Sequence, residues 1–147
     1  MKKLQQGLSL LEVLLVVAIA ATILLLTTRY FAISRLELKV AQSVSLIQKI
    51  SSASYLWLNG QSQADFSGPT VISMYPLQAA NYLGTVDLQD PWGGTILVSP
   101  GPNPQYVQIA LPKVPMDACN SLKQRLAKSA FQQISNCTSS SGYYGSF

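Results

Sequence analysis

The chain has 147 residues, ten basic and six acidic, with a net charge of +4 and no His. One domain is expected from this length. The lack of His excludes Ser/His and Cys/His catalysis, and with only two Cys no zinc site is expected. There is no paired-carboxylate or Gly-rich phosphate motif, and no basic patch interleaved with aromatic residues. We therefore expect no enzyme activity, no cofactor and no direct nucleic-acid binding.

The N-terminus consists of a short basic, polar leader followed by a long apolar run. The leader ends at Gly7, and the run from Leu8 to Leu26 is interrupted only by Ser9, Glu12 and Thr22. This length is enough to span a bilayer. A carboxylate inside such a span costs on the order of 2.5–3.5 kcal/mol, which makes Glu12 a candidate functional residue.

The segments that flank the apolar run indicate its topology. A secretory signal peptide would have a small-residue cleavage site after the run, but Leu26 is followed by Thr-Thr-Arg-Tyr-Phe. Lys2 and Lys3 precede the run and favour a cytoplasmic N-terminus. The rest of the chain would then lie across the membrane, with Arg29 near the membrane–water boundary, where its side chain can snorkel.

The register of basic leader, Gly, apolar run and Glu resembles the class III signal of type IV pilins and pseudopilins. In that family a membrane peptidase cuts after the Gly, the new N-terminus is methylated, and a Glu is the fifth mature residue. The resemblance implies cleavage between Gly7 and Leu8, N-methylation of Leu8, and a role for Glu12 in assembly. Leu rather than Phe as the first mature residue is more similar to type IVb pilins.

One long helix is predicted for the first third of the chain. No Gly or Pro occurs between Leu8 and Asn59, so a continuous helix over about 8–59 would be roughly 75 Å long. Residues 8–30 are apolar all round, whereas residues 31–59 are amphipathic and should pack on a globular domain. The predicted buried stripe consists of Ile33, Leu36, Val40, Val44, Ile47, Ile50 and Leu58.

Short elements separated by turns are predicted after Gly60. Residues 95–99 are rich in β-branched side chains and residues 105–111 alternate, and the two segments are predicted to form an antiparallel strand pair, a floor for the helix stripe. Before them we expect a strand or loop over 70–74 and a helical turn over 77–83. Trp92, in an Asp-Pro-Trp-Gly-Gly turn, is expected to be a core or cover residue rather than a binding residue.

The C-terminal region is predicted to be short and closed by a disulfide. Asp117 is a candidate N-cap for a helix through Leu122, Leu126 and Phe131, followed by a strand or loop over 132–137 and a polar, aromatic tail. Two Cys in a short exported domain favour a Cys119–Cys137 disulfide, the alternative being two buried thiols. The Val-Pro-x-x-Ala-Cys run before this helix is similar to the start of the disulfide-bounded region of type IVb pilins.

These patterns predict an α+β fold in which the long helix packs on a small antiparallel sheet beside a short disulfide-bounded helix region. The resemblance implies that this is the type IV pilin fold. The expected organisation is a removed leader (1–7), a transmembrane or fibre-core half of the helix (8–30) and a periplasmic or surface globular domain (31–147).

The resemblance implies a structural subunit of a type IVb-like pilus. Its expected partners are copies of itself, the prepilin peptidase/methyltransferase, the inner-membrane assembly machinery and the lipid bilayer. It would reside in the bacterial inner membrane and then in an extracellular pilus. The alternative is a pseudopilin of a type II secretion system, similar in size and in the Asp90–Gly93 run. Major pseudopilins often bind calcium, and Asp87 and Asp90 are the only close acidic pair here.

Overall fold

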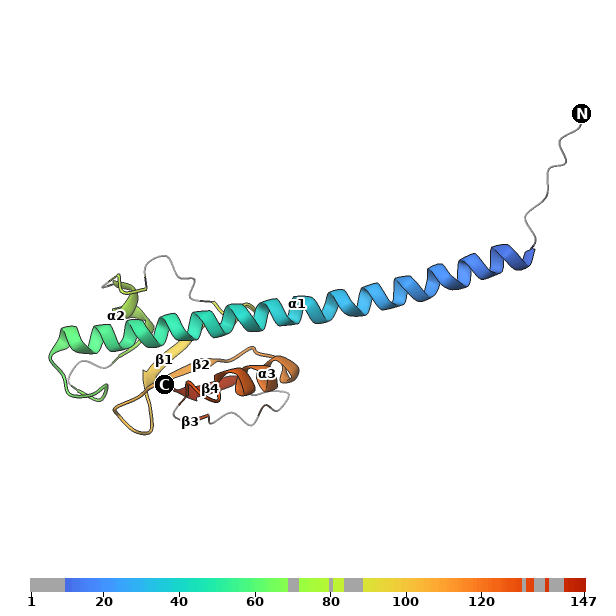
Figure 1. Cartoon of the computed structure of the whole chain (residues 1–147). Coiled ribbons are helices and arrows are strands. Elements are labelled where there is room, and N and C mark those ends of the chain that lie inside the picture. The colour runs from blue at the N-terminus through green and yellow to red at the C-terminus, as the bar shows by residue number, and fades with distance from the viewer. Residues whose placement is uncertain are drawn as a thin grey trace, which may run out of the picture. The chain divides into compact units, whose positions relative to one another are not determined.

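The computed structural model describes residues 10–68, 72–79, 81–83, 89–130, 132–133, 137 and 142–147. The elements are α1 (Leu10–Gln61), α2 (Met74–Ala79), β1 (Leu97–Pro100), β2 (Val107–Leu111), α3 (Met116–Leu126), β3 (Gln132–Gln133) and β4 (Tyr143–Ser146) (Figure 1). The chain forms two compact units, Met1–Leu36 and Glu37–Phe147, whose boundary lies within α1. The α+β class agrees with the prediction.

A four-stranded antiparallel sheet forms the floor of the second unit, in the order β1-β2-β4-β3. The predicted pairing of two strands is confirmed as β1 and β2, with Val98 opposite Ile109. Ile109 in turn lies opposite Gly145 of β4, which also pairs with Gln133 of β3. Pro100 ends the edge strand β1, a position where a missing backbone N–H is tolerated.

The part of α1 in the second unit buries one side on this sheet (Figure 1). The buried residues are Val40, Ser43, Ile47, Ile50, Ala53, Ser54 and Trp57. Val40, Ile47 and Ile50 were predicted, and Leu36, Val44 and Leu58 are half-buried. The prediction is wrong for Ile33, which is 62% exposed. The prediction also missed Trp57, which is almost fully buried.

α1 continues through the glycine that was expected to end it. The helix includes Gly60 and ends at Gln61, and Ser62 then takes the left-handed conformation (φ 54°). A Cβ at Gly60 would lie 2.7 Å from the hydroxyl oxygen of Tyr82. Gly60 is thus an internal residue of the last helical turn and does not end the helix.

The segment between α1 and the sheet differs from its prediction in part. Residues 69–71 lie outside the described residues, but Met74 already belongs to α2, so no strand reaches the end of the 70–74 segment. The helical turn predicted over 77–83 begins earlier and ends at Ala79. Leu77 and Leu83 are buried and hold this segment against the core.

α3 begins at Met116, two residues earlier than the predicted N-cap at Asp117 implies. Pro115 occupies the N-cap position in an extended conformation and makes no side-chain capping hydrogen bond, so the prediction of Asp117 as N-cap is wrong. Asp117 lies in the first turn, where its charge favours the helix macrodipole. Ala118, Leu122 and Leu126 are buried as the helix period requires, and Phe131 lies outside the described residues.

The prediction of a polar, aromatic tail at the C-terminus is wrong, because this part of the chain contains a strand inside the sheet. β4 lies between β2 and β3, and Tyr143, Gly145 and Ser146 are buried. Gly142, just before it, lies so close to β2 that a Cβ would be 1.9 Å from the carbonyl oxygen of Leu111. Only glycine fits there, so this residue sets how β4 enters the sheet.

Candidate functional site

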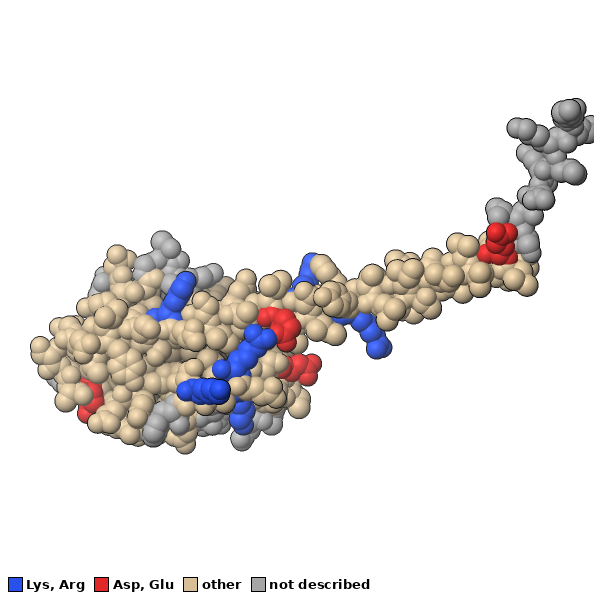
Figure 2. Space-filling model, viewed as in Figure 1, with Lys and Arg blue, Asp and Glu red and all other residues tan. Residues whose placement is uncertain are grey.

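Glu12 is the one charged residue in the apolar part of α1. Its side chain is exposed, and the next charged residue along the helix is Arg29. Figure 2 shows the uncharged stretch between the acidic group near the start of the described helix and the first basic side chains. A helix of this length and composition is able to cross a membrane, and none of its most apolar window is buried inside the protein.

The apolar side chains of this segment point outward on every side. Their exposed fractions lie between 46% and 78%. They are Leu10, Leu11, Val13, Leu14, Leu15, Val16, Val17, Ile19, Ile23, Leu24, Leu25 and Leu26. A helix that is apolar all round needs lipid or other helices around it.

The threonine side chains in and just after this segment are satisfied by the helix itself. The Thr22 hydroxyl donates to the carbonyl oxygen of Ile19 at 2.8 Å. The Thr27 and Thr28 hydroxyls donate to carbonyl oxygens three or four residues earlier at 3.0 Å. No threonine donor is therefore left unpaired in an apolar surrounding, and Glu12 is the group that needs a partner there.

The predicted cleavage and methylation residues, Gly7 and Leu8, lie outside the described residues. The expected cationic partner of Glu12 is the Leu8 amine of the same chain, four residues away on one helix face, or of a neighbouring subunit, and Leu8 lies outside the described residues. The structure thus places Glu12 on an apolar helix but leaves its cationic partner unassigned.

Side-chain contacts join the second half of α1 to the rest of the globular unit, among them the following. The Tyr55 hydroxyl donates to the carbonyl oxygen of Phe147 at 2.9 Å. The Glu37 carboxylate pairs with the Arg125 guanidinium of α3. The Lys39 ammonium lies 6.0 Å from the ring centroid of Trp92, so this half-buried ring covers α1.

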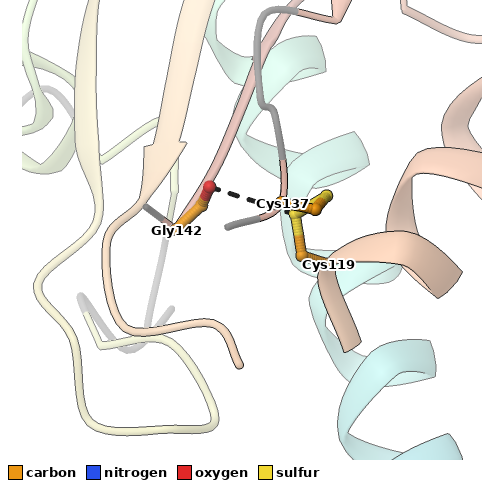
Figure 3. Close-up of a disulfide and its surroundings, with 3 residues drawn as sticks. All are labelled: Cys119, Cys137 and Gly142. Atoms are coloured by element: carbon orange, nitrogen blue, oxygen red, sulfur yellow. Dashed lines mark hydrogen bonds between the residues drawn. A yellow bond between two sulfur atoms is a disulfide. The ribbon is translucent and has the colours of Figure 1, made fainter. Parts of the chain in front are cut away.

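A disulfide joins Cys119 of α3 to Cys137, with 5.5 Å between the Cα atoms. Figure 3 shows the bridge beside the Gly142 carbonyl oxygen, which lies 4.0 Å from the Cys119 sulfur. Both cysteines are buried. The predicted disulfide is confirmed, and it fastens α3 to the segment that leads into β4.

Asp90 builds a turn. One of its carboxylate oxygens accepts the backbone N–H groups of Trp92 and Gly94, both at 2.8 Å. Its other oxygen is buried and has no hydrogen-bond partner among the described residues. Asp87 lies outside them, and no group of three or more potential metal ligands occurs within them. Within the described residues, Asp90 stabilises a turn through these two hydrogen bonds.

The pKa values of buried Tyr143 and half-buried Tyr55 are raised above the usual value. Burial raises the pKa of the Tyr143 phenol well above its usual range. Burial, and then the neighbouring Tyr106, raise the pKa of Tyr55. Both phenols therefore stay neutral at physiological pH; the Tyr55 hydroxyl donates a hydrogen bond, whereas the buried Tyr143 hydroxyl has no hydrogen-bond partner among the described residues.

No protein-family model, curated protein or solved structure matches the chain at a significant level. The resemblance to type IV pilins thus rests on the residues of the chain itself, chiefly the register of Gly7 and Glu12.

Proposed function

We propose that the chain is a non-enzymatic structural subunit that inserts in the bacterial inner membrane and assembles with copies of itself into a type IVb-like pilus. Cleavage between Gly7 and Leu8 and methylation of Leu8 by a prepilin peptidase/methyltransferase would precede assembly. The inner-membrane pilus machinery would then transfer the subunit from the bilayer to an extracellular fibre.

The single observation that carries this proposal is the apolar half of α1, exposed on all sides and charged only at Glu12. Such a helix is stable in a bilayer, and bundling many copies replaces the lipid once the subunits leave it. The globular unit, with its own buried core and disulfide, would then form the coat of the fibre.

Glu12 would set the stagger between neighbouring helices. Inside a bundle its carboxylate needs a cation, and the methylated amine of Leu8 in a neighbour supplies one. Removing one partner of a buried ion pair costs about 3–5 kcal/mol, because the other charge stays buried without compensation. Every stagger between neighbouring helices that leaves the Glu12 carboxylate unpaired would thus be destabilised.

The second candidate is a pseudopilin of a type II secretion system, favoured by the turn that Asp90 builds before Trp92. The Cys119–Cys137 disulfide favours the pilus subunit, because a disulfide is unusual among the major pseudopilins that the chain resembles. The two proposals share membrane insertion and processing, and they differ in where the mature chain accumulates.

The decisive measurement is the intact mass and N-terminal sequence of the protein from sheared surface fibres and from membranes. A chain that begins at methylated Leu8 and is abundant in fibres is expected. The same processed chain confined to membranes would favour the pseudopilin. A chain that still begins at Met1 in the presence of the peptidase would contradict both.

The role of Glu12 is tested with Glu12→Val, for which we expect normal processing but no incorporation into fibres. Thr22→Val is the matched control, because the Thr22 hydroxyl is bonded within its own helix and needs no partner. Normal fibres from the Glu12 variant, or the same loss in the control, would contradict the proposed pairing.

A further inference from the structure

A belt of cationic and aromatic side chains follows the apolar part of α1. It consists of Arg29, Tyr30, Phe31 and Arg35. Tyr30 and Phe31 are 78% and 57% exposed, and the Arg35 guanidinium lies over the Phe31 ring, 4.3 Å from its centroid. All four residues belong to the first compact unit.

The belt surrounds the helix rather than marking one face. Successive residues of an α-helix are rotated by about 100°, so Arg29, Tyr30 and Phe31 point in three directions spread around the axis. Arg35 points roughly 120° away from Arg29 by the same geometry. A protein partner would cover one side of the helix, whereas polar and aromatic side chains on all sides suit a helix that passes through a layer. The boundary of a bilayer is such a layer, and aromatic and basic residues are enriched there.

Arg29 is also the first group after Glu12 that requires water or an anion. The hydroxyls of Thr22, Thr27 and Thr28 are bonded to their own helix, so hydrocarbon tolerates the helix up to Thr28. A guanidinium presents a planar fork of donors that fits phosphate. The plane of the Arg35 guanidinium lies over the Phe31 ring. The N–H donors at the edge of the guanidinium are therefore available to such an anion.

We propose that Arg29 and Arg35 bind phosphodiester groups of lipid headgroups, and that this belt fixes the depth of Glu12 in the bilayer. This inference rests on the membrane insertion proposed above but not on fibre assembly. Residues 12 and 29 are 29 − 12 = 17 positions apart, which is about 26 Å along a helix. A hydrocarbon core is about 30 Å thick. With Arg29 at the headgroups, the Glu12 carboxylate therefore lies at the opposite edge of the hydrocarbon.

The depth is measurable by cysteine scanning of the full chain in vesicles of phosphatidylethanolamine and phosphatidylglycerol, opened so that both faces are accessible. Single cysteines replace Val13, Leu24 or Ala32, and a charged maleimide reports which ones contact water, while the native cysteines are bridged. In the otherwise unchanged chain we expect fast reaction at position 32 and protection at positions 13 and 24.

Arg29→Leu should move the boundary toward Arg35, a shift of six residues or about 9 Å. Position 32 then becomes protected and position 13 reactive, while Arg29→Lys keeps the original pattern. An unchanged pattern in Arg29→Leu would overturn the depth-setting role but leave insertion intact. Reaction at position 24 in the unchanged chain would overturn membrane insertion as well.

The phosphodiester contact itself is tested by solid-state NMR dephasing between ¹³Cζ-labelled arginine and lipid ³¹P in the same vesicles. The chain has three arginines, and Arg125 is paired with Glu37. We expect dephasing that persists in Arg125→Lys and decreases in Arg29→Leu and in Arg35→Leu. Absence of dephasing, or its loss in Arg125→Lys alone, would overturn the proposed contact.

Discussion

The two halves of α1 form one helix but are built for different surroundings. Before Leu36, large apolar side chains are exposed on every side. From Glu37 onward a single stripe is buried, and the opposite side carries polar residues and a few exposed ones such as Leu38 and Leu56. The helix period is the same in both halves, so the difference lies in how widely the apolar positions are spread around the axis. A one-sided stripe predicts a partner within the same chain, whereas an all-round surface predicts a partner outside it.

The sharpest test of this comparison removes the same side-chain atoms from each half. Ile47 is fully buried, whereas Ile19 is 52% exposed. Ile47→Ala should lower the free energy of unfolding of the globular unit by about 2–5 kcal/mol, because it leaves a cavity. Urea unfolding of the full chain in detergent, followed by the fluorescence of buried Trp57, measures the change.

Ile19→Ala is the control and should leave that free energy unchanged. Equal losses in the two variants would mean that the apolar half is also part of the folded core.

Replacement of the disulfide should destabilise the globular unit alone. The double variant Cys119→Ala/Cys137→Ala opens a loop with a sequence separation of 18, for which the chain-entropy model gives a loss of about 3 kcal/mol. The urea midpoint should fall, whereas extraction of the chain from membranes should not change. An unchanged midpoint would show that the packing of α3 suffices without the bridge.

The alkaline stability of the globular unit should depend on Tyr143. Its pKa is raised in the folded state, so above pH 10 the unfolded chain loses the proton that the folded chain keeps. Stability is therefore full below about pH 10 and falls at higher pH, by at most about 1.4 kcal/mol per pH unit for one group. Urea unfolding between pH 8 and 11 should show a smaller decline in Tyr143→Phe.

Tyr75→Phe, at a 78% exposed position, is the matched control and should keep the decline of the original chain. Identical slopes in all three proteins would assign the alkaline loss to other groups. At neutral pH the Tyr143 variant should be about as stable as the original, because this hydroxyl has no hydrogen-bond partner among the described residues.

The smallest effect on the free energy of unfolding is expected for the ion pair at Glu37, the first residue of the globular unit. Glu37 and Arg125 form an ion pair whose side chains are 47% and 45% exposed. Such surface pairs contribute about 0.2–1 kcal/mol, and salt weakens them. A double-mutant cycle of Glu37→Gln and Arg125→Gln should give a coupling in this range that decreases at high salt. A coupling of several kcal/mol would show that this contact defines the boundary between the units.

The sequence predicts the elements that depend on local patterns. Val40, Ile47 and Ile50 are large, apolar and spaced by the helix period, and the strand pair around Val98 and Ile109 alternates. The stripe beyond Ile50 was harder to predict, because Ala53 and Ser54 are small and one is polar. Both are buried, and the Ser54 hydroxyl is satisfied by the Ile50 carbonyl oxygen at 2.7 Å. Trp57 continues this spacing, and its large apolar side chain was the signal from which the continuation of the buried stripe could have been predicted.

β4 was missed because its determinants are distant in sequence. Gly145 and Ser146 interrupt the apolar alternation, and their partners in β2 lie more than thirty positions earlier, at Ile109 and Gln108. The aromatic residues Tyr143, Tyr144 and Phe147 indicate strand propensity but not a central position. For the candidate site, the sequence correctly predicts the disulfide, the role of Glu12 stays a prediction, and the position of Arg35 over Phe31 required the structure.

The central position of β4 has a consequence for folding during synthesis. The chain is made from its N-terminus onward, so α1 and β2 are complete long before residues 143–146. Until β4 arrives, β2 has an open edge beside it, and the Tyr55 hydroxyl lacks its acceptor on Phe147. Unpaired strand edges of this kind favour aggregation. The globular unit thus completes its sheet only after nearly its whole length has been made.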